Sequence, residues 1–379
     1  MTPLAEDLLD DAALLGARDP HGMLRAVASG AGQVREAAQL AAEAGLARLA
    51  DEDRPRAVVV CGMGGSGIAG DVLAAVAGAG CPVPMLTHRA HGLPTWVGAA
   101  DLVVAVSCSG STAETLSALE EAVRRGCRLL VVGAAGSPLE ALAGRGRALF
   151  VPVSQGRQPR ASIWALSTPL LVAADALGLL SAGPEVVEAT AALLEQLAGR
   201  CRPGAELVLN PAKQLALSLA GQLPAVWGSS PLTGVAAYRL ACQLNENAKS
   251  PASYGVLPEA AHNQVVAFDG PFARGLRSEA DLFADPVEDP DERTRLHLVL
   301  LRDTEEHPQV ARSAAAARDL ARERGVEVTE LLAEGGSAFE RLASLVALGD
   351  FASTYLALAQ GADPTPVEAI TALKARVGR

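Results

Sequence analysis

The sequence is poor in lysine and has more acidic than basic side chains. Its 379 residues carry a formal net charge of −11 at pH 7, and the only lysines are Lys213, Lys249 and Lys374. A nucleic-acid-binding protein needs a basic face, so we expect no nucleic-acid partner. An anionic ligand would have to be held by local dipoles and a few cations, because the overall charge repels it.

Targeting, membrane and disulfide signals are also missing. The amino terminus has no basic region, and acids separate its apolar residues at helical spacing, which predicts a helix rather than a signal peptide. No segment of about 18 residues lacks both a charge and a loop-forming cluster, which argues against a membrane span. The six cysteines occur singly, without a C-x-x-C pair, as is typical of reduced thiols. We therefore expect a cytoplasmic protein that contacts no membrane.

Short apolar runs alternate with amphipathic stretches through the first half of the chain. Residues 57–61, 102–107 and 128–133 are nearly continuous apolar runs, which predict buried strands. The stretches 68–76 and 112–125 between them have helical spacing. Strand–helix alternation of this kind predicts an α/β fold with a parallel sheet covered by helices on both faces.

The second half repeats this outline, so a chain of 379 residues is expected to form two tandem α/β sandwiches. Further strands are predicted at 224–227, 297–301 and 326–331, and further helices at 232–247, 310–324 and 339–359. The predicted domains are an N-terminal helical segment (1–45), a first domain (46–182), a helical connector (183–204), a second domain (205–362) and a C-terminal helix (363–379).

A glycine-rich turn, Gly62-Met-Gly-Gly-Ser-Gly67, lies between a predicted strand and a predicted helix. Backbone N–H groups and the helix dipole favour an anion at such a position. The letters also fit the G-x-G-x-x-G pattern of dinucleotide-binding folds, which place an acidic residue about 20 positions later for the ribose. Residues 83–89 contain no carboxylate, so a nicotinamide cofactor is disfavoured.

A second turn, Ser107-Cys-Ser-Gly-Ser-Thr112, also joins a strand to a helix, and its hydroxyls could donate to phosphate oxygens. Capping is the alternative, with Ser111 as N-cap and Glu114 completing a capping box, but it would use only one or two hydroxyls. Two such turns at the carboxyl ends of strands in one sheet predict a monophosphate site in the crevice between them. The second half has Arg302 and Asp303 at the corresponding place, so only the first domain is expected to bind phosphate.

With these turns and the segment Gln158–Ser162, the sequence resembles the sugar isomerase (SIS) domain superfamily. More closely, it looks like the bifunctional phosphoglucose/phosphomannose isomerases of archaea and some bacteria. The similarity extends, in the family's order, over Asn245–Lys249, Pro258–Asn263, Asp350–Tyr355, Asp363–Val367 and Lys374. The resemblance implies two tandem SIS-type domains, each a parallel sheet flanked by helices in a three-layer sandwich.

The resemblance also implies an activity, the interconversion of glucose 6-phosphate or mannose 6-phosphate with fructose 6-phosphate, without metal or cofactor. Arg160 would lie beside the carbons that exchange a proton, and Glu246 would be the base. His262 and Lys374 would assist opening of the sugar ring, and Lys374 would reach the site on the returning C-terminal helix. In the family the counterpart of His262 enters from a partner subunit, which implies a homodimer. The residues implied to hold the substrate phosphate are Gly65, Ser66, Ser107, Ser109 and Thr112.

These side chains suit the chemistry independently. Aldose–ketose isomerisation needs a carboxylate that moves a proton between C2 and C1, and a fixed cation that stabilises the enediolate. Arginine keeps its proton, and histidine supplies an acid or base near neutral pH. Each residue also has an ordinary explanation: Glu246 as a solvated helix end, His262 as a cap of the following strand, Lys374 as a charge that complements the helix dipole, and Arg160 as a surface residue.

Two other functions fit the same phosphate turns. A regulator could bind a sugar phosphate without turning it over, or an isomerase could act on an amino sugar phosphate or a pentose phosphate. The proton-transfer set described above favours an isomerase, because a sensor needs no such set. Gln264 stands where many relatives carry an acid, and the acidic, turn-rich stretch 272–292 matches none of the motifs.

Overall fold

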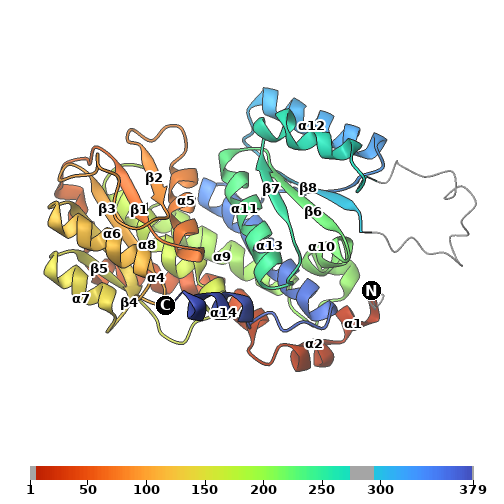
Figure 1. The fold of residues 1–379 in the computed structure, drawn as a ribbon, viewed down its shortest axis with the longest axis horizontal. Helices are drawn as coiled ribbons and strands as arrows, with labels where there is room; N and C mark the ends of the chain where they lie inside the picture. Colours follow the sequence, from red (N-terminus) through yellow and green to blue (C-terminus); the bar gives the residue numbers. More distant parts are fainter. Residues whose placement is uncertain (1–5, 274–293, 378–379) are drawn as a thin grey trace, which may run out of the picture. The chain divides into compact units, whose positions relative to one another are not determined.

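The computed structural model describes residues 6–273 and 294–377, which form two compact units (Figure 1). The five-stranded unit comprises Ala26–Gln196 and Glu334–Ser344. The four-stranded unit comprises the described residues of Met1–Arg25, Leu197–Ala333 and Leu345–Arg379.

The sheet of the five-stranded unit is entirely parallel, with the strand order β2-β1-β3-β4-β5. Valine and leucine fill its central strands, which are buried on both faces, as in sheets covered by helices on two sides. The strands are β1 (Val58–Cys61), β2 (Met85–His88), β3 (Leu102–Ser107), β4 (Arg128–Ala134) and β5 (Leu149–Val153).

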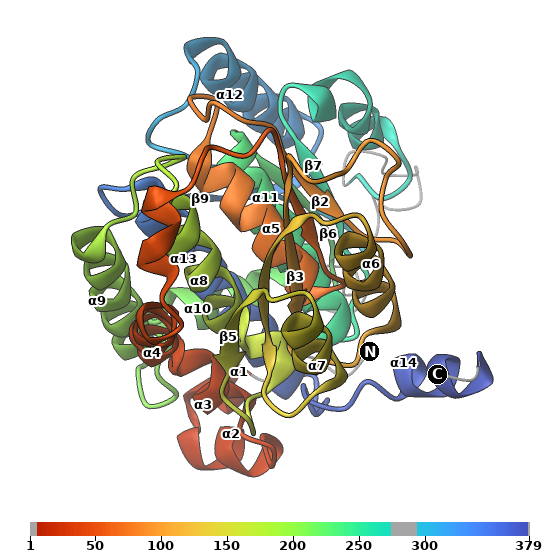
Figure 2. The same cartoon turned by 90° about the vertical axis from the view of Figure 1, so that its left-hand side faces the viewer.

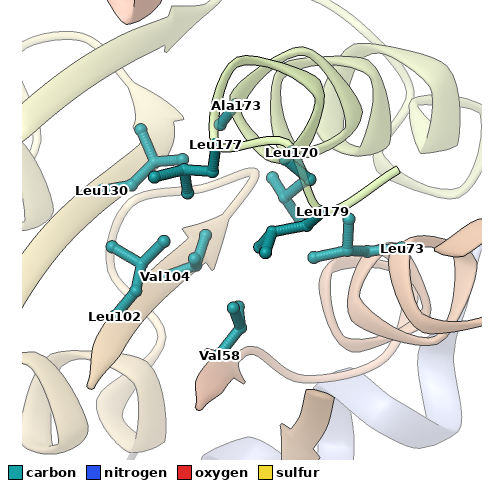
Figure 3. Close-up of a pocket in the computed structure, with 10 residues that line it drawn as sticks. Val58, Leu73, Leu102, Val104, Leu130, Leu170, Ala173, Leu177 and Leu179 are labelled. Carbon is teal, nitrogen blue, oxygen red and sulfur yellow. The ribbon is translucent and has the colours of Figure 1, made fainter. Parts of the chain in front are cut away.

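Alternate residues of these strands face two helical layers. Val59, Val103 and Val131 pack with the helices α6 and α7. Val58 and Val104 point to the other face, where they line a small apolar cavity beneath α5 and α8 (Figure 3), and α4 packs on α8 (Figure 2). The helical segments of this unit are α4 (Gly30–Glu43), η1 (Leu46–Asp51), α5 (Gly65–Ala77), α6 (Ala113–Arg124), α7 (Pro138–Arg145), η2 (Pro159–Ala161), α8 (Ile163–Ala176) and most of α9 (Pro184–Arg200).

The four-stranded unit has a second parallel sheet, with the order β7-β6-β8-β9. Trp227, Leu298 and Leu300 of this sheet pack with α12, while α11 packs on β6 and β7. The strands are β6 (Leu223–Gly228), β7 (Ser253–Val256), β8 (Leu296–Arg302) and β9 (Glu327–Leu332). The helical segments are α1 (Glu6–Asp10), α2 (Ala12–Arg18), η3 (Leu207–Leu209), α10 (Pro211–Leu219), α11 (Pro231–Glu246), η4 (Glu259–His262), η5 (Gln264–Asp269), α12 (Pro308–Glu323) and α14 (Glu368–Arg376), with α3 (Met23–Ala28) and α13 (Ala338–Ala359) contributing to both units.

The structure confirms the predicted fold class, since both sheets are parallel and flanked by helices. The two packing units are discontinuous in sequence, however, and the predicted segment 1–45 is divided between them at Arg25. The predicted connector 183–204 is divided at Gln196, and residues 334–344 belong with the five-stranded unit. The predicted domain boundaries stay a prediction, and most of the stretch 272–292 lies outside the described residues.

Among the described helices, α13 alone is long and apolar enough to cross a membrane, judged by length and composition. However, 94% of its most apolar stretch is buried, as in the core helix of a globular protein. The six cysteines are all free thiols.

Candidate functional site

The glycine turn and the serine turn lie at the same edge of the five-stranded sheet. β1 and β3 are parallel neighbours, and each turn follows the carboxyl end of its strand. The strand order places β2 on one side of β1 and β3 on the other. β1 is therefore the topological switch point of the sheet, the kind of position at which parallel α/β folds bind ligands.

Glycine is needed at different positions of the first turn for different structural reasons. A Cβ atom on Gly62 would lie 2.9 Å from the backbone of Ser66, and one on Gly67 would lie 2.8 Å from the Gly62 carbonyl oxygen. These two glycines let the turn pack on itself. Gly64 has φ 53° at the start of α5, and Gly65 would meet only the Pro159 carbonyl oxygen, at 3.9 Å. Gly64 and Gly65 are therefore the positions where a ligand can approach the backbone.

Hydroxyl groups converge between the two turns. Ser107 Oγ lies 3.0 Å from Thr112 Oγ1 and 3.5 Å from Ser109 Oγ. Ser66 belongs to the other turn, and its Oγ accepts a hydrogen bond of 3.2 Å from the Cys108 backbone N–H. The four predicted hydroxyl residues thus form one connected group within the five-stranded unit.

The alternative explanation of the serine turn, a capping box of Ser111 and Glu114 at the start of α6, is wrong. Thr112, not Ser111, is the N-cap, and among the described residues its side chain makes no capping hydrogen bond. Ser111 Oγ instead donates to Ser109 Oγ at 3.2 Å. The start of α5 has no side-chain cap in the described chain either, whereas Ser137 caps α7. Helix starts without a side-chain cap can bind an anion, although in α5 the N–H groups of Ser66 and Gly67 donate to the Met63 carbonyl oxygen at 3.1 and 3.3 Å.

Arg160 lies in the short turn η2, close to the glycine turn. The adjacent Pro159 carbonyl oxygen faces the Gly65 position, and Ser162 at the end of η2 hydrogen-bonds Cys108. Burial raises the pKa of the Cys108 thiol, although Ser162 and Arg157 act in the opposite direction. Cys108 is therefore a neutral thiol at neutral pH, and the cation nearby is Arg157, which precedes η2 and pairs with Glu36.

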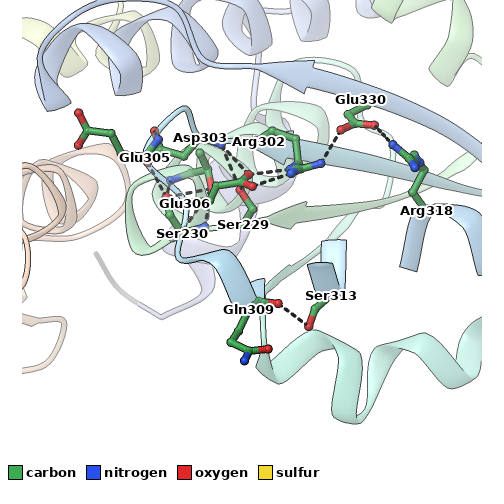
Figure 4. A network of polar contacts seen from close by, with 11 residues as sticks. Ser229, Ser230, Arg302, Asp303, Glu305, Glu306, Gln309, Ser313, Arg318 and Glu330 are labelled. Atoms are coloured by element: carbon green, nitrogen blue, oxygen red, sulfur yellow. Dashed lines mark hydrogen bonds and ion pairs between the residues drawn. The ribbon is translucent and has the colours of Figure 1, made fainter. Parts of the chain in front are cut away.

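The corresponding edge of the four-stranded sheet is already filled by carboxylates (Figure 4). The Glu306 side chain accepts hydrogen bonds from Ser229 Oγ, from the Asp303 N–H at 3.0 Å and from Arg302 Nε at 2.6 Å. Ser230 donates to Asp303 at 2.9 Å and also caps α11. Burial by itself raises the pKa of Glu306, but hydrogen bonds from Arg302 and Ser229 outweigh it and hold the pKa below its usual range. A negative charge therefore stands where a second phosphate would bind.

Glu246 is the last residue of α11, a helix anchored by buried polar side chains. Arg239 and Gln243, on the preceding turns, both hydrogen-bond the Asp350 carboxylate of α13. Asn247, directly after Glu246, donates to Ser353 Oγ at 3.1 Å. These contacts fix the rotation of α11 about its axis. They therefore determine the side of the helix from which the half-buried Glu246 projects within the four-stranded unit.

His262 ends the short turn η4 and is exposed. The idea that it caps a following strand is wrong, because the next element is the turn η5, which Asn263 caps. Gln264 has a structural role: its Oε1 accepts from Trp227 Nε1 at 2.7 Å and its amide donates to the Tyr254 carbonyl oxygen at 3.0 Å.

Lys374 lies in the last turn of α14, and none of the described residues of this helix is buried. Glu246, His262 and Lys374 thus belong to the four-stranded unit, while Arg160 and the phosphate-turn residues belong to the five-stranded unit. Among the described residues, no group of His, Cys, Asp or Glu side chains could hold a metal ion. Sequence reasoning gave Lys249 no role, although its ammonium contacts the end of α11.

Comparison with known proteins points to one family. A family model described as the bacterial phospho-glucose isomerase C-terminal SIS domain matches residues 209–377. The chain is 34% identical over 317 residues to a bifunctional phosphoglucose/phosphomannose isomerase of Caldicellulosiruptor bescii, covering 84% of this chain and 88% of that one. It is 31% identical over 320 residues to the protein of the same name from Aquifex aeolicus, covering 84% and 89%. A solved structure of a hypothetical protein from Thermus thermophilus matches with a TM-score of 0.70 at 18% identity, covering 98% and 94%, which shows the fold alone.

Proposed function

Because the chain belongs to the bifunctional phosphoglucose/phosphomannose isomerase family, we propose that it interconverts glucose 6-phosphate and mannose 6-phosphate with fructose 6-phosphate. One observation carries the proposal: two helix starts that have no side-chain cap among the described residues meet a connected group of hydroxyls at the β1/β3 edge. That edge offers N–H and O–H donors to a phosphate. The donors proposed for the phosphate are Gly65, Ser66, Ser107, Ser109 and Thr112.

Proton transfer is assigned to Glu246. Its carboxylate would take the proton from C2 of the open-chain aldose and return it to C1, which is general base catalysis followed by general acid catalysis. The Arg160 guanidinium would stabilise the enediolate oxygen as charge develops, and it keeps its own proton throughout. His262 and Lys374 would move the proton between the ring oxygen and O1 when the sugar ring opens. This set of side chains completes the reaction without a metal or cofactor.

The active assembly is proposed to be a homodimer in the cytoplasm. His262 would complete the site of the partner subunit. Two features support this arrangement: His262 is exposed in its own unit, and the nearby Val266 is 65% exposed. The six free thiols are consistent with a reducing compartment.

The test compares two matched variants with the wild-type protein in the presence of a chelator. Glu246→Gln keeps the size of the side chain but removes the base, so kcat should fall by about 10²–10⁴ with KM nearly unchanged. Ser109→Ala removes a charge-assisted hydrogen bond worth about 1.5–3 kcal/mol, so KM should rise by roughly 10–10² with kcat nearly unchanged. Fructose 6-phosphate is assayed from each aldose, together with exchange of solvent tritium into the C2 position.

The outcomes separate the alternatives. Wild-type protein that binds hexose 6-phosphates without turnover would be a regulator. Turnover of glucosamine 6-phosphate or a pentose phosphate alone would show that the protein is an isomerase of that sugar phosphate instead. Tritium exchange at the wild-type rate in Glu246→Gln would assign the base to another residue.

A further inference from the structure

Lys249 joins two distant segments of the four-stranded unit. Its ammonium donates to the backbone carbonyl oxygens of Glu246 and Asn247, both at 3.1 Å, and to that of Asp363 at 2.8 Å. The first two carbonyls end α11, and the third lies 114 positions later in sequence. One cation thus bridges the end of the helix that carries Glu246 and the segment that leads to α14.

The contact to the helix end has a physical reason. The last carbonyls of an α-helix have no intrahelical partner, and a cation there also complements the negative end of the helix dipole. Lys249 reaches them with φ 54°, and it is one of two non-glycine residues with positive φ in the described part of the chain. Such a backbone costs about 1–2 kcal/mol for a residue other than glycine, so the surrounding contacts must hold it.

The contact to Asp363 anchors the other segment. Asp363 itself accepts a hydrogen bond from the Thr365 N–H at 2.9 Å and pairs with His21 at 2.9 Å. This turn begins the segment that continues into α14, where Lys374 lies. The position of the Asp363 carbonyl relative to Glu246 therefore depends on the Lys249 ammonium.

The earlier turns of α11 do not need Lys249. The Asp350 carboxylate holds Arg239 and Gln243, and Ser353 holds Asn247. The chain directly after Asn247 is held by the burial of Ala248 and by a hydrogen bond of 3.1 Å from the Ser250 N–H to the Leu244 carbonyl oxygen. To these contacts the ammonium adds a direct link between the Glu246 backbone and Asp363.

We propose that Lys249 is a positioning residue for the isomerisation. It holds the Glu246 backbone and the segment leading to Lys374 in one arrangement, without touching the substrate. The inference rests on the proposed function, in which Glu246 is the base. Because misplacing a reacting group by about 1 Å can cost about 10² in rate, Lys249→Ala should lower kcat by roughly 10–10² with KM nearly unchanged.

Three further variants isolate the ammonium. Lys249→Gly removes it but accepts positive φ without strain, so kcat should fall as far as in Lys249→Ala. Lys249→Arg restores donors to the same carbonyls and should recover most of the lost activity. Arg312→Ala removes one exposed cation from α12 in the same unit and should keep wild-type kcat. Thermal midpoints are measured for all four variants, so that loss of folded protein is not mistaken for loss of rate.

A double-mutant cycle separates positioning from a merely structural role. If Lys249 acts through Glu246, adding Lys249→Ala to Glu246→Gln should lower kcat by no more than about twofold, within the error of additivity. Full additivity of the two losses, normal kcat in Lys249→Gly, or normal kcat in Lys249→Ala would each overturn the proposal while leaving the isomerase assignment intact. Wild-type turnover in Glu246→Gln alone would instead refute the base assignment, and this inference with it.

Discussion

Replacing Asp350 with alanine should destabilise the four-stranded unit by about 3–5 kcal/mol, the usual cost of breaking a buried ion pair. Arg239 donates to the two Asp350 carboxylate oxygens at 2.9 and 2.7 Å, and Gln243 donates to one of them at 3.1 Å. The side chains of Arg239 and Asp350 are only 3% and 4% exposed. The alanine variant would leave the Arg239 guanidinium buried without this carboxylate.

The expected shift in melting temperature follows from the size of the unit. For 150–250 residues, 1 kcal/mol corresponds to about 2–4 °C, so a fall of roughly 6–20 °C is expected. Asp350→Asn keeps one acceptor oxygen and should cost less. An Arg239→Met/Asp350→Leu double variant removes both charges and should recover most of the loss, because well-packed apolar side chains replace buried pairs at little cost.

Tryptophan fluorescence during urea unfolding reports on this unit. Trp227 is fully buried and stacks on Phe268 with ring centroids 5.5 Å apart. A Trp164→Phe background removes the buried tryptophan of the five-stranded unit. The tryptophan that remains in that unit is Trp96, which is 47% exposed. Arg35→Ala, which breaks an exposed pair with Glu188, is the control and should leave the midpoint unchanged.

Two results would contradict this reasoning. A loss of less than about 1 kcal/mol of unfolding free energy in Asp350→Ala would mean that the buried pair stabilises the protein no more than an exposed pair does. Equal stability of Asp350→Ala and of the Arg239→Met/Asp350→Leu double variant would mean that the loss of stability does not come from burying the Arg239 guanidinium without the Asp350 carboxylate.

Two predictions remain. Because the pKa of Glu306 is held below its usual range, its stabilising effect should be complete above its unfolded pKa of about 4.3 and be lost as the pH falls through the folded value. The unfolding free energy of Glu306→Gln should therefore depend less on pH than that of the wild type in urea titrations below about pH 4.3. A mixture of inactive His262→Ala and inactive Glu246→Gln subunits should regain activity, since one site of each hybrid dimer has both residues intact; no recovery despite proven subunit exchange would count against a shared site.

The buried strands could be predicted from the sequence, whereas of the edge strands only β9 was, as the stretch 326–331. β1, β3 and β4 are continuous apolar runs because helices cover both faces. β2 and β7 lie at sheet edges, and most of their residues are partly or fully exposed, so the apolar signal is weak. β5 contains Pro152, which lowers its strand signal and is tolerated at an edge.

The phosphate turns could be predicted because their residues are close in sequence. Capping by Ser111, the alternative explanation of the serine turn, is wrong because capping depends on backbone geometry, and the chain places Thr112 at the N-cap. The contacts of Lys249 could not be predicted, since they depend on a positive φ and on Asp363 far along the chain. The discontinuous units likewise follow from contacts that no local pattern contains.

The carboxylate-filled edge of the four-stranded sheet has a consequence for substrate binding. The four strands of the second sheet follow the order of the first four positions of the five-stranded sheet, so each sheet has an edge where an anion could bind, but Glu306 already accepts from the donors at one of these edges. We therefore expect a calorimetric titration with substrate to reach one equivalent per chain. With a single site in each polypeptide, a sigmoidal equilibrium binding curve could arise only from communication between separate chains.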